Sequence, residues 1–342
     1  KPADAPEYRY IKLEGEKPGG VYNINELEIY AVVAKGIELY ASPVASENAD
    51  GTQDFPFDIY SAAEMYRKYA AMGINVDGIN LLSGDYYLDK TLELDSLYSG
   101  LKLQGIGNVN IYGSYKIEPD MISVADESDC GGRLPAELIG EIVKIDLSGY
   151  AQNEFLTKSN YKDYSEINVS VTRTPKDTIS DIELFDNAVP KICARWPDDT
   201  WENMGKITTI DEQTARFVTS NNLKWSENAD DIKIFNFRYA DFFAMPGDIT
   251  EINPENKTAT ISQKLLTAKF NVNSRYYFYN IPEEITKKGE YYINIDEKAA
   301  YYYPENINDM KLSVSSMSGG FFNIKAGAKN ILFDNIHFSQ LR

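Results

Sequence analysis

The sequence predicts a mainly β protein: the start of a right-handed parallel β-helix with an N-terminal capping helix, interrupted by an inserted antiparallel β-sandwich. Short strands with apolar residues at every second position occur near both ends of the 342-residue chain, at Ile79–Leu94 and Phe322–Phe338. Gly or Asn occurs at the corners between these strands, as a coil of a solenoid requires. Between the two regions the strands become longer and are joined by hairpin turns, which is typical of an antiparallel sandwich.

Residues 1–34 form a separate pattern. Two alternating segments, Tyr8–Glu14 and Asn25–Tyr30, predict a pair of strands. Tyr10–Leu13 followed by Ile24–Ile29 resembles the last two strands of a discoidin-like β-sandwich. Because two strands alone are marginally stable in water, we expect this segment to be the remnant of such a module.

Residues 35–115 are predicted to hold the cap and the first coils of the β-helix. Asp58 is expected to cap a helix over Ile59–Met72, and Gly73 to end it in the left-handed conformation. This amphipathic helix can cover strand edges at the open end of a β-helix. The strands expected after it are Ile79–Leu88, Thr91–Leu94, Leu101–Gly105 and Asn110–Gly113.

Residues 116–310 are predicted to be the inserted β-sandwich, and residues 311–342 the resumed coils. The expected strands of the insertion are Ile142–Leu147, Ile182–Phe185, Lys191–Trp196, Arg216–Thr219, Ile232–Tyr239, Asp248–Ile252, Thr258–Ser262, Glu290–Ile295 and Ala300–Tyr303. A coil cannot bury its inner face alone. We therefore expect the remaining coils of a longer parent protein to be a partner of this chain.

The charge balance is acidic, with 34 Lys and Arg against 52 Asp and Glu and a net charge of −18. Such a surface repels phosphate backbones, which argues against nucleic acid and anionic membranes, and mildly against polyanionic glycans such as pectate. No run approaches the roughly 20 apolar residues that span a membrane, so no membrane insertion is expected. Neutral oligo- and polysaccharides remain open as partners.

His337 is the single histidine, which nearly excludes a His-ligated metal cluster or a Ser-His triad. We expect no metal site and no cofactor. His337 itself is a proton shuttle or an exposed side chain at a coil corner. The two cysteines, Cys130 and Cys193, are interpreted as separate buried thiols or as a disulfide pair.

Several segments together resemble one family. Gly84–Leu88 with Thr91–Leu94, Ala194–Asp198, Arg275–Asn280 and Tyr301–Pro304 are similar, in order and spacing, to elements of secreted bacterial right-handed β-helix glycoside hydrolases. That family has β-xylosidase-like and α-fucosidase-like members, and the resemblance covers roughly residues 36–342. It implies an extracellular or cell-surface protein that hydrolyses glycans with two carboxylates on later coils.

No matching catalytic coil precedes Arg342, so the catalytic residues stay unassigned and are expected beyond residue 342. We therefore leave open whether this chain is itself an enzyme, and we expect it to lack the carboxylate pair that glycoside hydrolysis needs. Two other functions remain: a non-catalytic carbohydrate-binding or scaffold module, and a polysaccharide lyase or epimerase on the same fold, which would need basic residues or Ca²⁺.

The candidate substrate-binding residues lie in one segment and are Arg195, Trp196, Asp198 and Trp201. Sugar rings stack on aromatic faces, while Arg and Asp bond sugar hydroxyls. The competing interpretation places Trp196 in a sandwich core beside Cys193 and makes Asp198-Asp199 a solvated turn. The tyrosine runs Tyr276–Tyr279, Tyr291–Tyr292 and Tyr301–Tyr303 are likewise either cross-strand core packing or a glycan platform.

Overall fold

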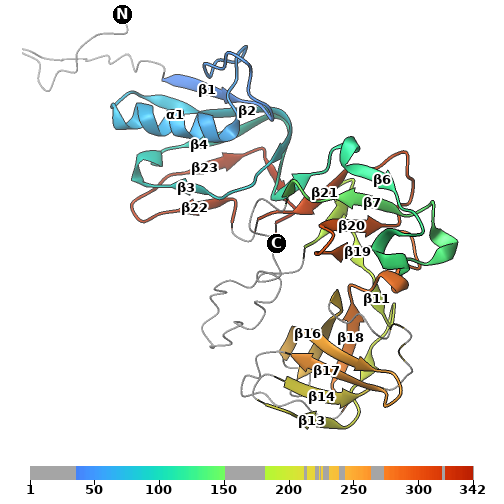
Figure 1. Cartoon of the computed structure of the whole chain (residues 1–342). Coiled ribbons are helices and arrows are strands. Elements are labelled where there is room, and N and C mark those ends of the chain that lie inside the picture. Colours follow the sequence, from blue (N-terminus) through green and yellow to red (C-terminus); the bar gives the residue numbers. More distant parts are fainter. Residues whose placement is uncertain are drawn as a thin grey trace, which may run out of the picture. The chain divides into compact units, whose positions relative to one another are not determined.

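The computed structural model describes residues 36–150, 182–211, 214–219, 223, 225, 231–238, 243–262, 273–317 and 320–341. These residues are mainly β, with one α-helix and several 3₁₀ turns (Figure 1). They form two compact units: one takes in residues up to 83 with 95–108 and 326–335, and the other takes in 84–94, 109–325 and 336–341. The segment interpreted as a discoidin-like remnant, residues 1–34, lies outside the described residues.

Parallel strand pairing dominates the first unit. Strand β1 (Ile37–Ala41) pairs in parallel with β2 (Val76–Tyr87), and β4 (Lys102–Tyr112) follows in the same sheet. Strand β23 (Leu332–Asp334) pairs in parallel with the first part of β4. Residues from the two ends of the described chain therefore share one sheet.

Helix α1 (Ile59–Ala71) forms where the sequence predicts it. The Asp58 side chain accepts hydrogen bonds from the backbone N–H groups of Tyr60 and Ser61, both at 2.9 Å, which satisfies two donors of the first turn. After the helix, Gly73 adopts φ of +72°, a conformation that favours glycine. The helix buries Tyr66, whose ring stacks on Tyr98 at 5.8 Å.

Two more parallel ladders occur in the second unit. Strand β3 (Leu92–Leu94) pairs in parallel with β22 (Phe322–Ile324), and the second part of β4 pairs in parallel with β24 (His337–Ser339). Phe322 and Phe338 meet at a centroid distance of 5.9 Å. The chain between β5 (Ser114–Lys116) and β21 (Leu312–Ser315) is a long excursion, because these two strands pair directly with each other.

The excursion begins with two sheets that enclose a common core. One has the order β10-β19-β20-β7-β6 and the other β5-β21-β8-β9. Their apolar faces share one cluster, which includes Ile145, Tyr291, Tyr302, Leu184 and Val314. The strands are β5 (Ser114–Lys116), β6 (Ile122–Val124), β7 (Val143–Asp146), β8 (Leu184–Asp186), β9 (Val189–Pro190), β10 (Ile192–Cys193), β19 (Glu290–Asn294), β20 (Ala299–Tyr302) and β21 (Leu312–Ser315).

A further, eight-stranded antiparallel sheet has its own core, built around Phe217, Ile234, Ile261 and Phe278. Its strands are β11 (Arg195–Trp196), β12 (Glu202–Asn203), β13 (Ile207–Thr209), β14 (Thr214–Val218), β15 (Lys233–Arg238), β16 (Phe243–Asn253), β17 (Thr258–Ser262) and β18 (Arg275–Tyr279). Short 3₁₀ helices are η1 (Ser96–Tyr98), η2 (Pro119–Met121), η3 (Asp129–Gly132), η4 (Ala136–Leu138) and η9 (Pro282–Glu284).

This sheet closes on itself through one segment, residues 202–209. The segment pairs with β18 at its start and with β14 at its end. Between them, the Met204 N–H donates to Ser274 O at 2.9 Å and the Gly205 N–H donates to Val218 O at 2.8 Å. We call this element the closed sheet; closure leaves few strand edges without a partner.

Asn280 connects the closed sheet to the five-stranded sheet. Its amide Nδ2 donates to the carbonyl oxygens of Asp231 and Ile293, both at 3.0 Å, and its Oδ1 accepts from the Ile293 N–H at 2.9 Å. Tyr292 on the five-stranded sheet donates its hydroxyl to Asp231 Oδ2 at 2.6 Å. Asn280 itself is fully buried, so these bonds satisfy a side chain that would otherwise be costly to bury.

Three expectations differ from the structure. Leu101–Gly105 and Asn110–Gly113, expected as two strands, form one strand, because β4 runs through Gly107 at φ of +81°. The expected single sandwich is two packed sheets plus the closed sheet, since residues 202–209 add pairings that alternation alone does not reveal. Leu312–Ser315, expected to be resumed coil, pairs antiparallel with β5 and β8, and parallel pairing returns at Phe322.

Candidate functional site

The predicted binding segment lies on the closed sheet. Strand β11 pairs Arg195 with Tyr279 and Trp196 with Phe278, and β12 pairs Glu202 with Tyr276. Both short strands therefore run along β18, and residues 197–201 loop out between them. The peptide bond between Trp196 and Pro197 is cis.

Trp196 turns into the core of the closed sheet. Its ring stacks on Phe278 at 6.3 Å and meets Trp225 edge-on at 5.9 Å. Both partners are buried, at 0% and 5% exposure. The core interpretation of Trp196 is thus the one that its contacts favour, and we do not include it in the candidate surface.

Trp201 lies on the opposite, outer face. Its ring contacts Tyr277 and Phe237, each at a centroid distance of 5.0 Å, and Phe235 at 6.2 Å. These partners alternate along β15 and β18 with fully buried residues such as Ile234 and Phe278. The outer rings are half-buried, so an aromatic cluster remains partly open to solvent.

Two arginines extend this cluster. The Arg195 guanidinium lies 3.7 Å from the centroid of the Tyr277 ring, and that of Arg275 lies 4.7 Å from the centroid of Phe237. Both also face Trp201, at 5.7 and 5.3 Å. Cation–π contacts of this kind fix the cations over the rings. We call the six residues the aromatic–arginine platform: Arg195, Trp201, Phe235, Phe237, Arg275 and Tyr277.

Arg195 also shapes the loop next to the platform. Its Nε donates to Pro197 O at 2.9 Å and its Nη2 donates to Thr200 O at 2.6 Å. Partial burial lowers the pKa of Arg195, and the nearby Tyr277 and Asp199 oppose that shift. The side chain therefore holds residues 197–200 in place and keeps a positive charge on the platform.

The acidic residues of the segment are paired with a lysine. Lys287 Nζ lies 3.1 Å from Asp198 Oδ2 and 2.8 Å from Asp199 Oδ2. The hydrogen bond from Lys287 lowers the pKa of Asp199. Asp198 and Asp199 thus lie in a solvent-accessible turn, with the Asp199 side chain 83% exposed, and share one ammonium group.

Glu290 is the buried carboxyl group nearest in sequence to this lysine. It is 4% exposed, and its Oε2 accepts from the N–H groups of Thr286 and Lys287, both at 2.8 Å. Burial raises its pKa, and these two hydrogen bonds oppose the rise. Its bonds to the local backbone indicate a structural role in the turn before β19.

The tyrosine runs serve mainly as core. Four of these tyrosines are fully buried: Tyr276, Tyr292, Tyr301 and Tyr302. The hydroxyl of Tyr302 donates to Asp186 Oδ2 at 2.9 Å. Only Tyr277 of these runs joins the platform. For Tyr277, the sequence pointed to an exposed position only through the alternation of faces within Tyr276–Tyr279. For Phe235, Phe237 and Arg275, the sequence indicated no more than a strand.

The remaining candidates lie elsewhere. Cys130 and Cys193 are both free thiols, and burial raises the pKa of Cys130 to about 12. Cys193 is half-buried, with Sγ 3.6 Å from Asn280 Oδ1. His337 is an exposed side chain on β24. Among the described residues, no group of three or more His, Cys, Asp or Glu side chains is arranged to hold a metal ion.

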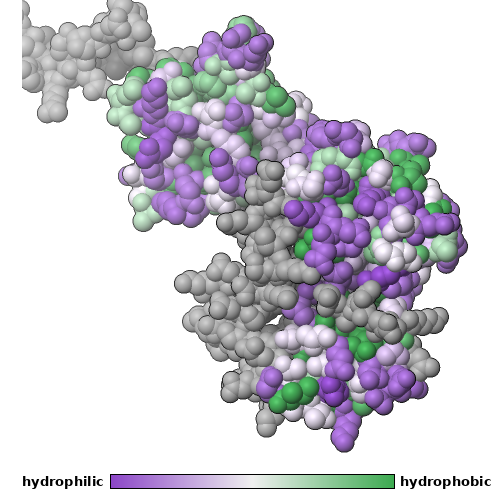
Figure 2. Space-filling model, viewed as in Figure 1, coloured by the Kyte–Doolittle hydropathy of each residue, from purple (hydrophilic) through white to green (hydrophobic). Residues whose placement is uncertain are grey.

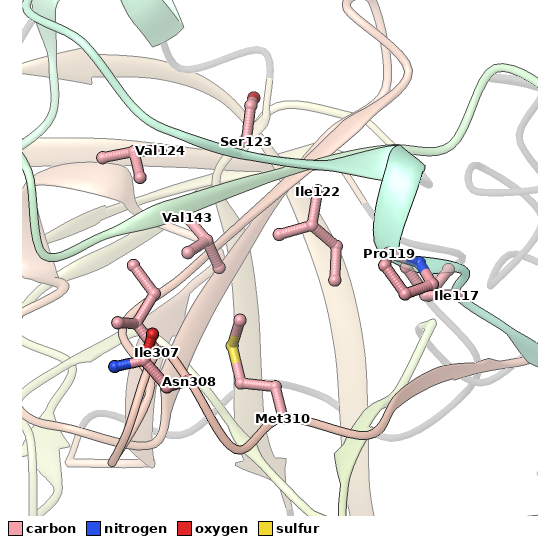
Figure 3. A pocket seen from close by; sticks show the side chains of 9 residues that line it. All are labelled: Ile117, Pro119, Ile122, Ser123, Val124, Val143, Ile307, Asn308 and Met310. Atoms are coloured by element: carbon pink, nitrogen blue, oxygen red, sulfur yellow. The ribbon is translucent and has the colours of Figure 1, made fainter.

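An apolar groove lies at the edge of the two packed sheets (Figure 3). It has a volume of about 380 Å³, and its walls include Ile122, Val143, Ile307 and Met310. Ser123 and Asn308 are its only polar lining side chains, which is poor chemistry for a sugar. The visible face of the described residues is otherwise largely hydrophilic, with small separate apolar patches (Figure 2). No helix in the described part of the chain is long and apolar enough to cross a membrane.

Comparison with known proteins gives one structural likeness. No protein-family model and no curated protein sequence matches this chain. A solved structure described as a glycoside hydrolase is similar, with a TM-score of 0.63 and 16% sequence identity. The match covers 90% of this chain and 51% of that one, so this chain spans about half the length of its structural neighbour. The likeness is one of fold.

Proposed function

We propose that this chain is part of a carbohydrate-active protein and binds a neutral oligosaccharide on the aromatic–arginine platform. The observation that carries the proposal is the half-exposed Trp201–Tyr277 pair, with rings 5.0 Å apart and the Arg195 guanidinium 3.7 Å from Tyr277. The C–H face of a sugar ring packs on such aromatic surface, and guanidinium N–H groups donate to its hydroxyls.

Arg195 has a donor to spare for this purpose. Its Nε and Nη2 bind loop carbonyls, while Nη1 makes no hydrogen bond within the described part of the chain. The net charge of −18 on the whole chain disfavours a polyanionic glycan. The same charge gives no support to a lyase or epimerase acting on uronates.

The fold supports the same class of protein. We propose that the parallel strands within residues 37–112 and 322–339 belong to one right-handed β-helix capped by α1, and that the chain between them is its insertion. The parallel ladders β3–β22, β4–β23 and β4–β24 support this, since they join the early and late segments directly. The likeness to a structure described as a glycoside hydrolase agrees with it.

Hydrolysis is proposed for the whole protein rather than for these residues. It needs an acid and a second carboxylate roughly 5–10 Å apart across the scissile bond. Asp198 is compensated by Lys287, and Glu290 is buried against the backbone, so neither is offered as catalytic. Catalytic carboxylates on further coils, and an extracellular or cell-surface location, remain parts of the proposal.

Tryptophan fluorescence tests the binding proposal. Titration with xylohexaose, cellohexaose and mannohexaose is expected to change the emission saturably for at least one of them. Trp201→Ala and Tyr277→Ala should abolish the response, while the core variant Trp196→Phe should keep it. A response that survives in Trp201→Ala, or no response to any of the three sugars, would contradict the proposal.

An activity assay separates the binding module from an enzyme. Incubation with a panel of aryl glycosides is expected to give no turnover by this chain alone. Robust turnover that is lost on Asp198→Asn or Glu290→Gln would show that the chain carries its own catalytic pair.

A further inference from the structure

A second group of polar and aromatic side chains lies on the parallel strands, outside the platform. Strands β2, β4 and β24 are neighbours, and β24 pairs in register with β4: His337 with Asn110, Phe338 with Ile111 and Ser339 with Tyr112. Leu88 N–H donates to Tyr112 O at 2.8 Å, which places the end of β2 beside the end of β4. Side chains from three strands therefore line up in rows.

Alternation decides which rows face outward. Tyr86, Leu88 and Ile111 are at most 2% exposed and point into the coil. Asp85 and His337 are exposed, and Asn110 and Tyr87 are half-buried on the other face. In β2 the buried positions change from odd to even numbers at Gly84, whose φ of +148° a side chain rarely adopts. This change turns Asp85 and Tyr87 outward.

The outer rows contact each other. Asn110 Nδ2 donates to Asp85 Oδ1 at 2.8 Å, and His337 lies next to Asn110 on the adjacent strand. Tyr87 and Tyr112 meet at a centroid distance of 5.1 Å with a tilt of 44°. Burial, with Asp85 as the next cause, raises the pKa of Tyr87 to about 12, so this hydroxyl stays a hydrogen-bond donor at neutral pH. We call Asp85, Tyr87, Asn110, Tyr112 and His337 the coil-face group.

This composition differs from the outward positions earlier on β4. Lys102 and Gln104 there are exposed polar side chains. The coil-face group instead offers the half-buried ring of Tyr87, backed by Tyr112 at 8% exposure, together with a carboxylate, an amide and an imidazole on three neighbouring strands.

We propose that the coil-face group is a second saccharide site, which takes one neutral sugar residue with its apolar face on Tyr87 and its hydroxyls on Asp85, Asn110 and His337. The ligand class rests on the proposed function, while the site is separate from the platform. The carboxylate of Asp85 excludes uronates and sulfated sugars by charge repulsion.

The single histidine makes a direct test possible. In the full chain, purified without a histidine tag and selectively labelled, the imidazole Cε1–H group gives one NMR signal, which must be His337. At fixed pH, xylohexaose, cellohexaose and mannohexaose are titrated, with hexagalacturonate as the anionic probe. We expect a saturable shift of the signal with at least one neutral sugar and none with hexagalacturonate.

Variants then locate the contact. Tyr87→Leu and Asn110→Ala should each weaken the affinity read from the His337 signal at least tenfold, and Tyr87→Phe, which keeps the ring, by no more than about threefold. Glu93→Gln is the matched control: it removes an exposed carboxylate that pairs with Lys325 at 2.6 Å on the other ladder, and should leave the affinity unchanged. Thermal unfolding of each variant verifies that it is folded.

The outcomes separate the two proposals, because tryptophan emission reports the platform and the His337 signal reports the coil face. A change in tryptophan emission without a shift of the His337 NMR signal overturns the coil-face site alone. A His337 shift without an emission response supports the coil-face site and overturns the platform. Silence of both probes with all three neutral sugars, a shift with hexagalacturonate, or equal effects of Tyr87→Leu and Glu93→Gln overturns the coil-face proposal.

Discussion

Arg195→Ala is the substitution whose effect on stability can best be worked out from the contacts. The side chain donates two hydrogen bonds to loop carbonyls, at 2.9 and 2.6 Å, and lies 3.7 Å from the Tyr277 ring centroid. Hydrogen bonds of charged groups contribute about 1.5–3 kcal/mol each, and an exposed cation–π contact about 0.5–1 kcal/mol. The low end of these ranges sums to about 3.5 kcal/mol, and because Arg195 is only half-buried, solvent screening reduces this to an expected loss of about 2 kcal/mol.

Urea unfolding followed by tryptophan emission measures this loss selectively. All three tryptophans, Trp196, Trp201 and Trp225, belong to the closed sheet or its core. With an m-value of about 2 kcal/mol/M, the midpoint should fall by about 1 M. Arg216→Ala is the matched control: this arginine of the same sheet makes an exposed ion pair with Glu251 at 2.7 Å, for which about 0–1 kcal/mol is typical. Equal urea midpoints for Arg195→Ala and Arg216→Ala would show that the contacts of Arg195 stabilise the closed sheet no more than an exposed ion pair does.

Three further outcomes are expected. Tyr292→Phe removes the 2.6 Å hydrogen bond to Asp231 and should lower the unfolding free energy by about 1–2 kcal/mol in urea titrations followed by circular dichroism; an unchanged value would contradict this. Asp58→Ala should speed hydrogen exchange of α1 about fivefold at pH 7, as loss of an N-cap costs about 1 kcal/mol. Desolvation raises the Asp58 pKa, but hydrogen bonds from the first turn outweigh it and hold the pKa low. The folded state thus binds this proton less readily, so the effect of Asp58→Ala is present above the ordinary value of 3.8 and should vanish as pH falls through the folded pKa. Lys287→Met should raise the pKa of Asp199 toward its ordinary value in a carbon-13 NMR titration; no rise would show that the ion pair does not persist in solution.

Elements that depend on residues close together in the sequence were predicted well. The helix over Ile59–Ala71 follows from a capping Asp58, an apolar stripe and Gly73, all within one short segment. Alternation and turn residues likewise predict strands at Phe322–Ile324 and Ile331–Phe333, and the structure has them at Phe322–Ile324 and, one residue later, at Leu332–Asp334. The mainly β class is confirmed because such signals add along the chain.

The site depends on pairings that alternation cannot supply. Trp196 and Trp201 fall in one short segment, yet they lie on opposite faces of the closed sheet, because residues 197–201 leave the strand and break the period of two. Phe235 and Phe237 reach Trp201 only through the pairing of β15 with β18. Lys287 also lies far along the chain from Asp198 and Asp199, so the acidic dipeptide alone could not reveal that it forms ion pairs with this lysine.

A crystal structure of the chain with a bound neutral hexasaccharide tests the central claim most directly. We expect a sugar ring stacked on Trp201 and Tyr277, with a sugar hydroxyl within hydrogen-bonding distance of Arg195 Nη1. A saturated complex in which the sugar leaves these rings bare would contradict it.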